Sequence, residues 1–187
     1  MPKRLTLHVA LLRAINLASH NTVSMTSLRA VVSGLGFDGV QSILQTGNLI
    51  FGSHGRTPDE LERLLEEATA RELGLDTQYF VRTASEWEGL IEVNPFPQHA
   101  EGDPSHLLVA CLKQAPDPER IAGLQRAIVG REQVRVVGRH AYIVYPDGIG
   151  RSRVSMAVIE RSLGTRGTGR NWNTVLRIGA HLGLFRS

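Results

Sequence analysis

The order of strand and helix patterns in the first half of the chain is the feature that most constrains its fold. Apolar and polar residues alternate over residues 5–12, as in a strand, and Ser24 can cap the helix pattern that follows. Two further apolar runs flank Gly47-Asn48, a two-residue turn signal. These patterns predict a strand, a helix and a β-hairpin in succession.

A second helix and a fourth strand are predicted after the hairpin. Thr57 and Glu60 form a capping-box pattern with Pro58 at the first helical position, and Gly74 is a helix stop signal. Residues 77–83 have the pattern of a strand. The complete order (strand, helix, strand, strand, helix, strand) predicts a ferredoxin-like split βαβ lobe.

The second half of the chain repeats this order of elements without repeating the residues. It predicts a strand, a helix from Asp117, a hairpin turn at Gly138-Arg139 and a helix over residues 152–163, with a final helix over 171–184 where a closing strand would stand. We therefore expect an α+β fold built from two related lobes.

A connection rich in proline and glycine over residues 94–104 suits a lobe boundary. The expected domains are a ferredoxin-like lobe over residues 1–93 and a second α+β lobe over residues 94–187. The second lobe is expected to carry two extra C-terminal helices.

Composition favours a soluble protein. Of 187 residues, 42% are hydrophobic and 21% are charged, which is enough to build a core and argues against disorder. The single cysteine, Cys111, can form no disulfide within the chain. The apolar run near the start is too short for a signal peptide or a membrane span. We expect a cytoplasmic protein with no membrane partner.

Positive charge is concentrated towards the C-terminus. Residues 151–187 hold seven arginines and one acid, Glu160, a balance of +6, whereas residues 1–150 hold fourteen basic and seventeen acidic residues, a balance of −3. This asymmetry favours an anionic partner, either a small molecule or a nucleic acid. The alternative is that the arginines pair with an acidic helix of the same chain, such as residues 59–72.

The stretch Arg170-Asn171-Trp172-Asn173 lies where the final helix is expected to begin. Trp172 lies on the apolar arc of that helix, which indicates a core anchor, and Asn171 suits the N-cap. Arg170 and Asn173 are then left to meet an anion beside the helix-start amides. A cap beside a solvated arginine is the alternative.

A glycine-bearing loop in the second half is another candidate anion site. Gly148 and Gly150 would let backbone amides turn towards an anion, and Arg151 and Arg153 would add charge beside a helix start at Ser152. The alternative is a tight turn followed by a serine cap. The loop lacks the Gly-Lys-Ser ending of a P-loop, so nucleotide hydrolysis is not indicated.

Polar residues at strand ends complete the candidate set. Arg13 and Asn16 follow the first strand, and Asn48 lies at the hairpin, where an ordinary turn role is the alternative. The ligand-binding hypothesis therefore names Arg13, Asn16, Asn48, Gly148, Gly150, Arg151, Ser152, Arg153, Arg170, Asn171 and Asn173.

Other chemistry-bearing patterns are missing from the sequence. The seven histidines form no HxH or HxxxH pair, and no GxSxG motif occurs. No metal, cofactor or catalytic residue is predicted.

Five segments in a fixed order resemble a bacterial family known only as a domain of unknown function. The most specific of them is Arg-Asn-Trp-Asn-Thr-Val, and the full set is residues 12–16, 44–48, 81–83, 145–152 and 170–175. The resemblance implies an α+β fold with ferredoxin-like elements in a cytoplasmic bacterial protein, and no established reaction. Ala14 and Ala18-Ser19 stand where the family tends to have glycines, so a ligand would approach this first loop less closely.

Two functions from different classes fit these patterns. The first is a binding module whose basic C-terminal region holds a phosphate-bearing ligand or nucleic acid, although the aromatic pair that such sheets use to stack RNA bases is not evident. The alternative is an enzyme or sensor acting on a small phosphorylated metabolite. Fold class does not choose between them.

Overall fold

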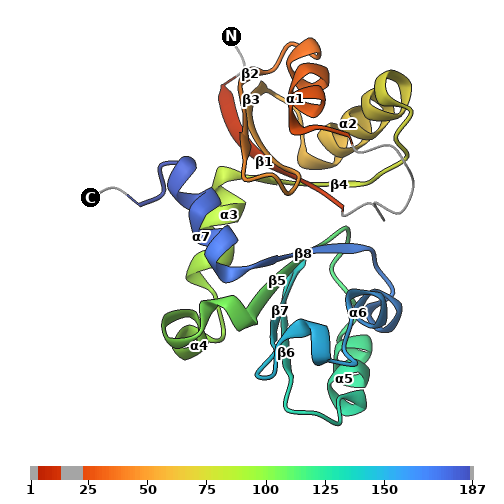
Figure 1. Cartoon of the computed structure of the whole chain (residues 1–187), viewed down its shortest axis with the longest axis vertical. Helices are drawn as coiled ribbons and strands as arrows, with labels where there is room; N and C mark the ends of the chain where they lie inside the picture. Colours follow the sequence, from red (N-terminus) through yellow and green to blue (C-terminus); the bar gives the residue numbers. More distant parts are fainter. Residues whose placement is uncertain (1–3, 14–22, 186–187) are drawn as a thin grey trace. The chain divides into compact units, whose positions relative to one another are not determined.

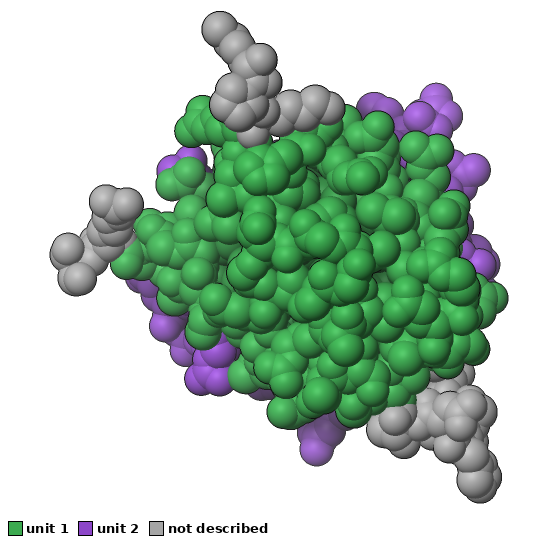
Figure 2. All heavy atoms as spheres, turned by 90° about the horizontal axis from the view of Figure 1, so that it is seen from above, with its two compact units in different colours: residues 1–88, 178–187 green, residues 89–177 purple. Residues whose placement is uncertain are grey.

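The computed structural model describes residues 4–13 and 23–185 and contains two four-stranded antiparallel sheets, one in each of two compact units (Figure 1). The first unit comprises residues up to Glu88 together with residues from Ile178 onward, and the second comprises Gly89–Arg177 (Figure 2). The predicted α+β class with two ferredoxin-like lobes is confirmed. Among the described residues, no helix has both the length and the apolar character needed to span a membrane.

The first unit has the predicted order of elements. Its strands pair in the order β2-β3-β1-β4, and both helices cover one face of the sheet (Figure 1). The strands are β1 (Leu5–Leu12), β2 (Asp38–Ile43), β3 (Asn48–His54) and β4 (Tyr79–Thr83), and the helices are α1 (Met25–Gly34) and α2 (Pro58–Leu73).

The helix ends of the first unit form as their sequence signals predict. Ser24 Oγ accepts a hydrogen bond from the Ser27 amide at the start of α1. Thr57 and Glu60 complete a reciprocal capping box at the start of α2. Gly74 ends α2 at φ +62°, a backbone conformation that glycine adopts without a Cβ penalty.

The predicted two-residue turn at Gly47-Asn48 is wrong. The turn covers residues 44–47, with Leu44 and Gly47 at positive φ, and Asn48 is the first residue of β3. The Asn48 amide is buried and donates to the Ile43 carbonyl (2.9 Å) and to Thr46 Oγ1 (2.9 Å). It therefore holds the longer turn closed from inside the sheet.

The second unit repeats the topology of the first. Its strands pair in the order β6-β7-β5-β8, with α5 and α6 on one face (Figure 1). The elements are β5 (Leu107–Leu112), α5 (Pro118–Ala127), β6 (Gln133–Val137), β7 (His140–Val144), α6 (Met156–Leu163) and β8 (Gly167–Asn171). The two-residue turn between β6 and β7 lies at Gly138-Arg139, as predicted.

Two features of the second unit differ from the prediction. Strand β8 closes the repeat, so only one helix, α7 (Trp172–His181), follows the second lobe instead of two. The strand escaped prediction because Gly-Thr-Gly-Arg-Asn has no apolar alternation. In addition, Ser155 rather than Ser152 caps α6, since Ser155 Oγ accepts from the Val158 amide (3.3 Å).

Shorter helices join the repeats and precede α6. They are α3 (Ala84–Glu92), α4 (Pro97–Gly102) and the 3₁₀ turns η1 (Pro104–His106) and η2 (Ile149–Arg151). The division between units falls inside α3, near the expected lobe boundary.

The central strand of each sheet is buried on both faces over most of its length, whereas the edge strands β2 and β6 are partly exposed. In the first, Ala10 and Leu12 of the central strand face the cluster beneath α1 and α2, while Val9 and Leu11 on the opposite face are also fully buried. The second sheet has the same character: Ala110 and Leu112 of β5 belong to the α5–α6 core, and Val109 and Cys111 behind them are 1% exposed. Tyr142 on that rear face donates its hydroxyl to the Leu90 carbonyl of α3 (2.6 Å).

The outer edge of the first sheet is lined by carboxylates. The backbone amides of Tyr79, Val81 and Thr83 in β4 point away from β1 and donate to three glutamates. The acceptors are Glu66 (3.0 Å), Glu62 (2.8 Å) and Glu86 (2.8 Å), in that order. The corresponding edge strand of the second unit, β8, uses the same device at one position, where the Gly167 amide donates to Glu160 (2.8 Å).

Trp172 is 4% exposed, as its place on the apolar arc of the helix predicts. We expect Trp172→Ala to lower the free energy of unfolding by about 3 kcal/mol or more, because it removes a large buried side chain and leaves a cavity. Urea denaturation measures this loss. Val129→Ala, at a site 98% exposed, is the control and should change stability by less than about 0.5 kcal/mol.

His8 is a fully buried titratable group in β1. Its ring stacks on Phe51 with centroids 5.8 Å apart, and neither ring nitrogen makes a hydrogen bond of normal geometry to the described residues. Burial lowers the pKa of His8, and the opposing effects of the Thr6 backbone and the Glu86 carboxylate are smaller. The folded protein therefore holds this imidazole neutral at pH values where the unfolded chain binds a proton.

This difference predicts a loss of stability in mild acid. Below about pH 6.5 the unfolded state takes up a proton at His8 that the folded state does not, so stability should fall by up to about 1.4 kcal/mol per pH unit from this group. His8→Phe should flatten the dependence of the urea midpoint between pH 7 and pH 5. Equal slopes for wild type and His8→Phe would contradict the assignment.

Candidate functional site

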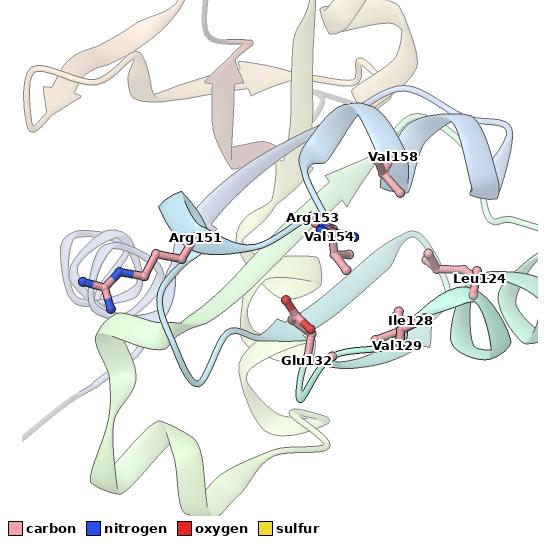
Figure 3. Close-up of a pocket in the computed structure, with 10 residues that line it drawn as sticks. Leu124, Ile128, Val129, Glu132, Arg151, Arg153, Val154 and Val158 are labelled. Carbon is pink, nitrogen blue, oxygen red and sulfur yellow. The ribbon is translucent and has the colours of Figure 1, made fainter.

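A pocket of about 360 Å³ lies in the second unit between the end of α5, the start of β6 and the loop that leads into α6 (Figure 3). Most of its wall is apolar, and three charged residues join it. The lining residues are Leu124, Ala127, Ile128, Val129, Gly130, Glu132, Arg151, Arg153, Val154 and Val158.

The loop that builds one wall of this pocket has no counterpart in the first unit. There, β3 connects to α2 through residues 55–57 alone, whereas β7 connects to α6 through residues 145–155. The fold is the same in both units, so closing the repeat does not require the longer loop. Added loops on a rigid scaffold are where binding residues concentrate.

Hydrogen bonds fix the loop on both sides of Arg153. Ser152 Oγ donates to Glu132 Oε1 and accepts from the Val154 amide (3.0 Å). The Val154 carbonyl in turn accepts from the Tyr145 hydroxyl (2.8 Å), and the Val154 side chain is buried in the core. The backbone that carries Arg153 is therefore held rigidly between residues 152 and 154.

The Arg153 guanidinium has no such partner. Among the described residues, neither Arg151 nor Arg153 forms a side-chain hydrogen bond or an ion pair, and both residues are exposed. Both arginines line the pocket, Arg153 next to the buried Val154, whereas the Arg151 side chain extends away from the other labelled residues in Figure 3. Arg153 is thus the cation inside the site, and Arg151 lies at its rim.

Glu132 gives the pocket an acidic side. Its carboxylate points into the space below Arg153 and Val154 (Figure 3). Burial raises the pKa of the Tyr145 hydroxyl, and the Glu132 carboxylate acts in the same direction, so Tyr145 remains a hydrogen-bond donor at neutral pH. The site accordingly combines two arginines that have no ion pair among the described residues, one carboxylate and an apolar wall.

The glycine amides are used differently from the prediction. The Gly148 amide donates to the Tyr145 carbonyl (2.9 Å), which closes a turn, and the Gly148 carbonyl accepts from the Arg151 amide. Gly148 has φ +83°, so glycine is required there by the backbone. The 3₁₀ turn over Ile149–Arg151 contains Gly150 and separates these residues from the start of α6. This arrangement is the turn that was the alternative interpretation of the loop.

Arg170 lies near the end of strand β8 and directly precedes Asn171, after which helix α7 begins. Its Nη1 donates to Thr168 Oγ1 (3.0 Å) and to the Gly169 carbonyl (2.8 Å), and burial lowers its pKa to about 10, so it stays protonated at neutral pH. Arg82 occupies the equivalent place in the first unit and donates to the Val81 carbonyl (2.7 Å). Arg82 pairs with Val9 in the ladder and Arg170 with Val109, so both arginines belong to the repeated scaffold.

Asn171 and Asn173, which follow Arg170, have different roles: the first caps helix α7 and the second lies on its surface. Asn171 Oδ1 accepts from the Thr174 amide (2.9 Å), which makes it the predicted N-cap of α7. Asn173 is exposed on the same helix. Neither residue lines the pocket.

The candidates from the first half belong to the first unit. The Arg13 side chain donates to Gln78 Oε1 (3.2 Å), and Asn48 holds the turn described above. Asn16 lies outside the described residues. The structure thus groups Arg151, Ser152 and Arg153 at one pocket, while Arg13, Asn48, Arg170 and Asn171 each make hydrogen bonds elsewhere.

Sequence reasoning missed Glu132 and the apolar wall. Glu132 lies between Arg131 and Gln133 and belongs to no recognisable motif, and Leu124 and Ile128 look like ordinary core positions of an amphipathic helix. The one available signal was Val129, an apolar residue just past the end of α5, which is 98% exposed at the pocket.

The fold is a two-unit α+β fold with a ferredoxin-like repeat, and in this chain the pocket lies on the second copy. The chain belongs to the family described as "Protein of unknown function (DUF1697)", which matches residues 5–142. The matched range ends before the loop at 145–155 and before β8, so it contains neither of the two basic segments.

A solved structure has the same fold. The conserved bacterial protein SP0830 from Streptococcus pneumoniae superposes with a TM-score of 0.73 at 20% sequence identity, over 96% of this chain and 99% of that one. At this identity the likeness concerns the fold alone. No curated protein matches the chain.

The role of Asn171 can be separated from that of Asn173 by stability measurements. Asn171→Ala should lower the free energy of unfolding by about 1 kcal/mol, because the first-turn amide of α7 loses its acceptor. Asn173→Ala should change it by less than about 0.5 kcal/mol. Equal effects in chemical denaturation would mean that the cap does not stabilise the helix.

Proposed function

We propose that this protein binds a small phosphate-bearing organic anion in the pocket beside α5 and α6, with Arg153 as its main cationic contact and Arg151 at the rim. The observation that carries the proposal is the unpaired Arg153 side chain on a rigidly held loop. Among the described residues it has no anionic partner, although its own backbone is fixed by Ser152, Val154 and Tyr145.

A rigid backbone makes such a cation effective. A guanidinium donates paired hydrogen bonds to phosphate oxygens, and a fixed Cα reduces the conformational entropy lost when they form. The apolar wall, which includes the exposed Val129, would cover the carbon skeleton of the ligand. Both features suit a small molecule with one charged end.

A nucleic-acid partner has less support. Ferredoxin-like RNA-binding domains stack bases on aromatic residues of an open sheet face. Here the described tyrosines and tryptophans are buried, and Val9, Leu11, Val109 and Cys111 on the rear faces of the central strands are buried as well. Phe185 is the exposed large aromatic of the described residues, and it lies beyond α7.

We also propose that the protein is a cytoplasmic bacterial protein. A soluble phosphorylated ligand fits the cytoplasmic, bacterial setting that the resemblance implied. We propose further that the Tyr-Pro-Asp-Gly-Ile-Gly-Arg-Ser segment, residues 145–152, serves the pocket, because Arg151 lines it and Ser152 bonds the lining residue Glu132.

Phenyl phosphate, which combines a phosphate group with an apolar body, is the probe for this site. Calorimetric titration should give an affinity that Arg153→Ala weakens by about tenfold or more, since a charge-assisted hydrogen bond contributes about 1.5–3 kcal/mol. Arg151→Ala should weaken it less.

Arg161→Ala is the matched control for these variants. Arg161 is an exposed arginine of the same basic segment that has no ion pair among the described residues and does not line the pocket. Its removal should leave the affinity unchanged. Equal affinities for wild type and Arg153→Ala would overturn the proposal, and tight salt-dependent binding of an oligonucleotide that Arg153→Ala abolishes would replace it with the nucleic-acid function.

A further inference from the structure

Glu132 lies inside the pocket that we propose for an anion, where its charge opposes binding. Two charges of the same sign at close range repel, and the repulsion grows in a partly enclosed site. Among the described residues no cation forms an ion pair with Glu132. Its presence in the wall therefore restricts which anions the pocket can hold.

One oxygen of this carboxylate is occupied and the other is available. Oε1 accepts the hydrogen bond from Ser152, whereas Oε2 makes no hydrogen bond with the described residues. A glutamine would hold Ser152 equally well through its carbonyl oxygen, so the loop contact alone does not account for a charged residue here.

Gly130 makes room for this arrangement. A Cβ on Gly130 would lie 2.0 Å from Glu132 Oε2, so the carboxylate occupies the space that any other residue at position 130 would fill. Gly130 does not have a positive φ, and its backbone conformation therefore does not require glycine. Because residue 130 has no side chain, the Oε2 oxygen of Glu132 has room at the pocket wall.

We infer that the ligand carries a hydroxyl group close to its phosphate, and that Glu132 selects for it by accepting a hydrogen bond at Oε2. This inference rests on the proposed function. The phosphate would meet Arg153 on one side while the hydroxyl meets Glu132 on the other, and the carbon skeleton would lie along the valines of the wall. A phosphate monoester without the hydroxyl would meet an unpaired carboxylate, which is a strong means of rejection.

Glycerol 3-phosphate and propyl phosphate form a matched pair of probes, because they share a three-carbon skeleton and differ in their hydroxyl groups. The wild-type protein should bind glycerol 3-phosphate about tenfold more tightly, as expected for one hydrogen bond to a charged acceptor. Glu132→Gln should reduce this preference, mainly by binding propyl phosphate more tightly once the repulsion is gone.

Two further variants test the position of the carboxylate. Gly130→Ala keeps the charge of Glu132 but displaces Oε2, so it should also reduce the preference. Arg161→Ala changes an exposed residue that does not line the pocket, so the preference should survive.

Three outcomes would count against the inference. Equal wild-type affinities for the two probes, or a full preference retained in Glu132→Gln, would overturn the role of Glu132 while leaving the anion site intact. Binding of neither these probes nor phenyl phosphate would overturn the proposed function, and the inference with it.

Discussion

The central strands β1 and β5 are buried on both faces over most of their length, so the middle of neither sheet offers a surface of strands to a ligand. Burial of the rear faces places Val9, Leu11, Val109 and Cys111 in the interior, where the largest hydrophobic contribution to stability arises. A binding site must then be built from loops and helix ends at the margin of a unit. The pocket beside α5 and α6 has that position.

Comparing the two copies of the repeat distinguishes arginines of the shared fold from arginines of the added loop. Charge alone does not make this distinction. Arg82 and Arg170 occupy equivalent ladder positions, and each donates to the carbonyl of the residue before it. A basic residue that recurs in both copies serves the architecture that both copies share. Arg153 lies in the loop over 145–155, which only the second copy has, and its side chain makes no such bond.

Local signals in the sequence were sufficient to predict most elements of the fold. Ser24, the Thr57–Glu60 capping box and Gly74 act through contacts within a few residues, so a window of sequence contains their whole mechanism. Strand β8 could not be predicted because its glycines pack closely against β5: a Cβ on Gly169 would lie 2.8 Å from the Leu108 side chain. That requirement comes from a partner strand about sixty residues away and leaves no alternation to detect.

The site was only partly predictable for the same reason. Arg151, Ser152 and Arg153 are adjacent in sequence and were found together, whereas Glu132 joins them only because β6 and the loop after β7 are brought side by side. The partners of Arg170 are on its own strand, but sequence alone could not show that this segment is a strand. Both the place of Glu132 in the pocket and the strand that carries Arg170 depend on contacts between segments that are distant in the sequence.

The glutamates along β4 have a consequence for assembly. Three carboxylates already accept the outward amides of this edge, so a strand from another molecule would have to displace three anions before it could add to the sheet. The first sheet is therefore closed to strand addition at β4, and β2 is its other edge. Edge-to-edge pairing of two such sheets would therefore use β2 of both copies, and the paired sheet would present only its two carboxylate-lined β4 edges to a further strand.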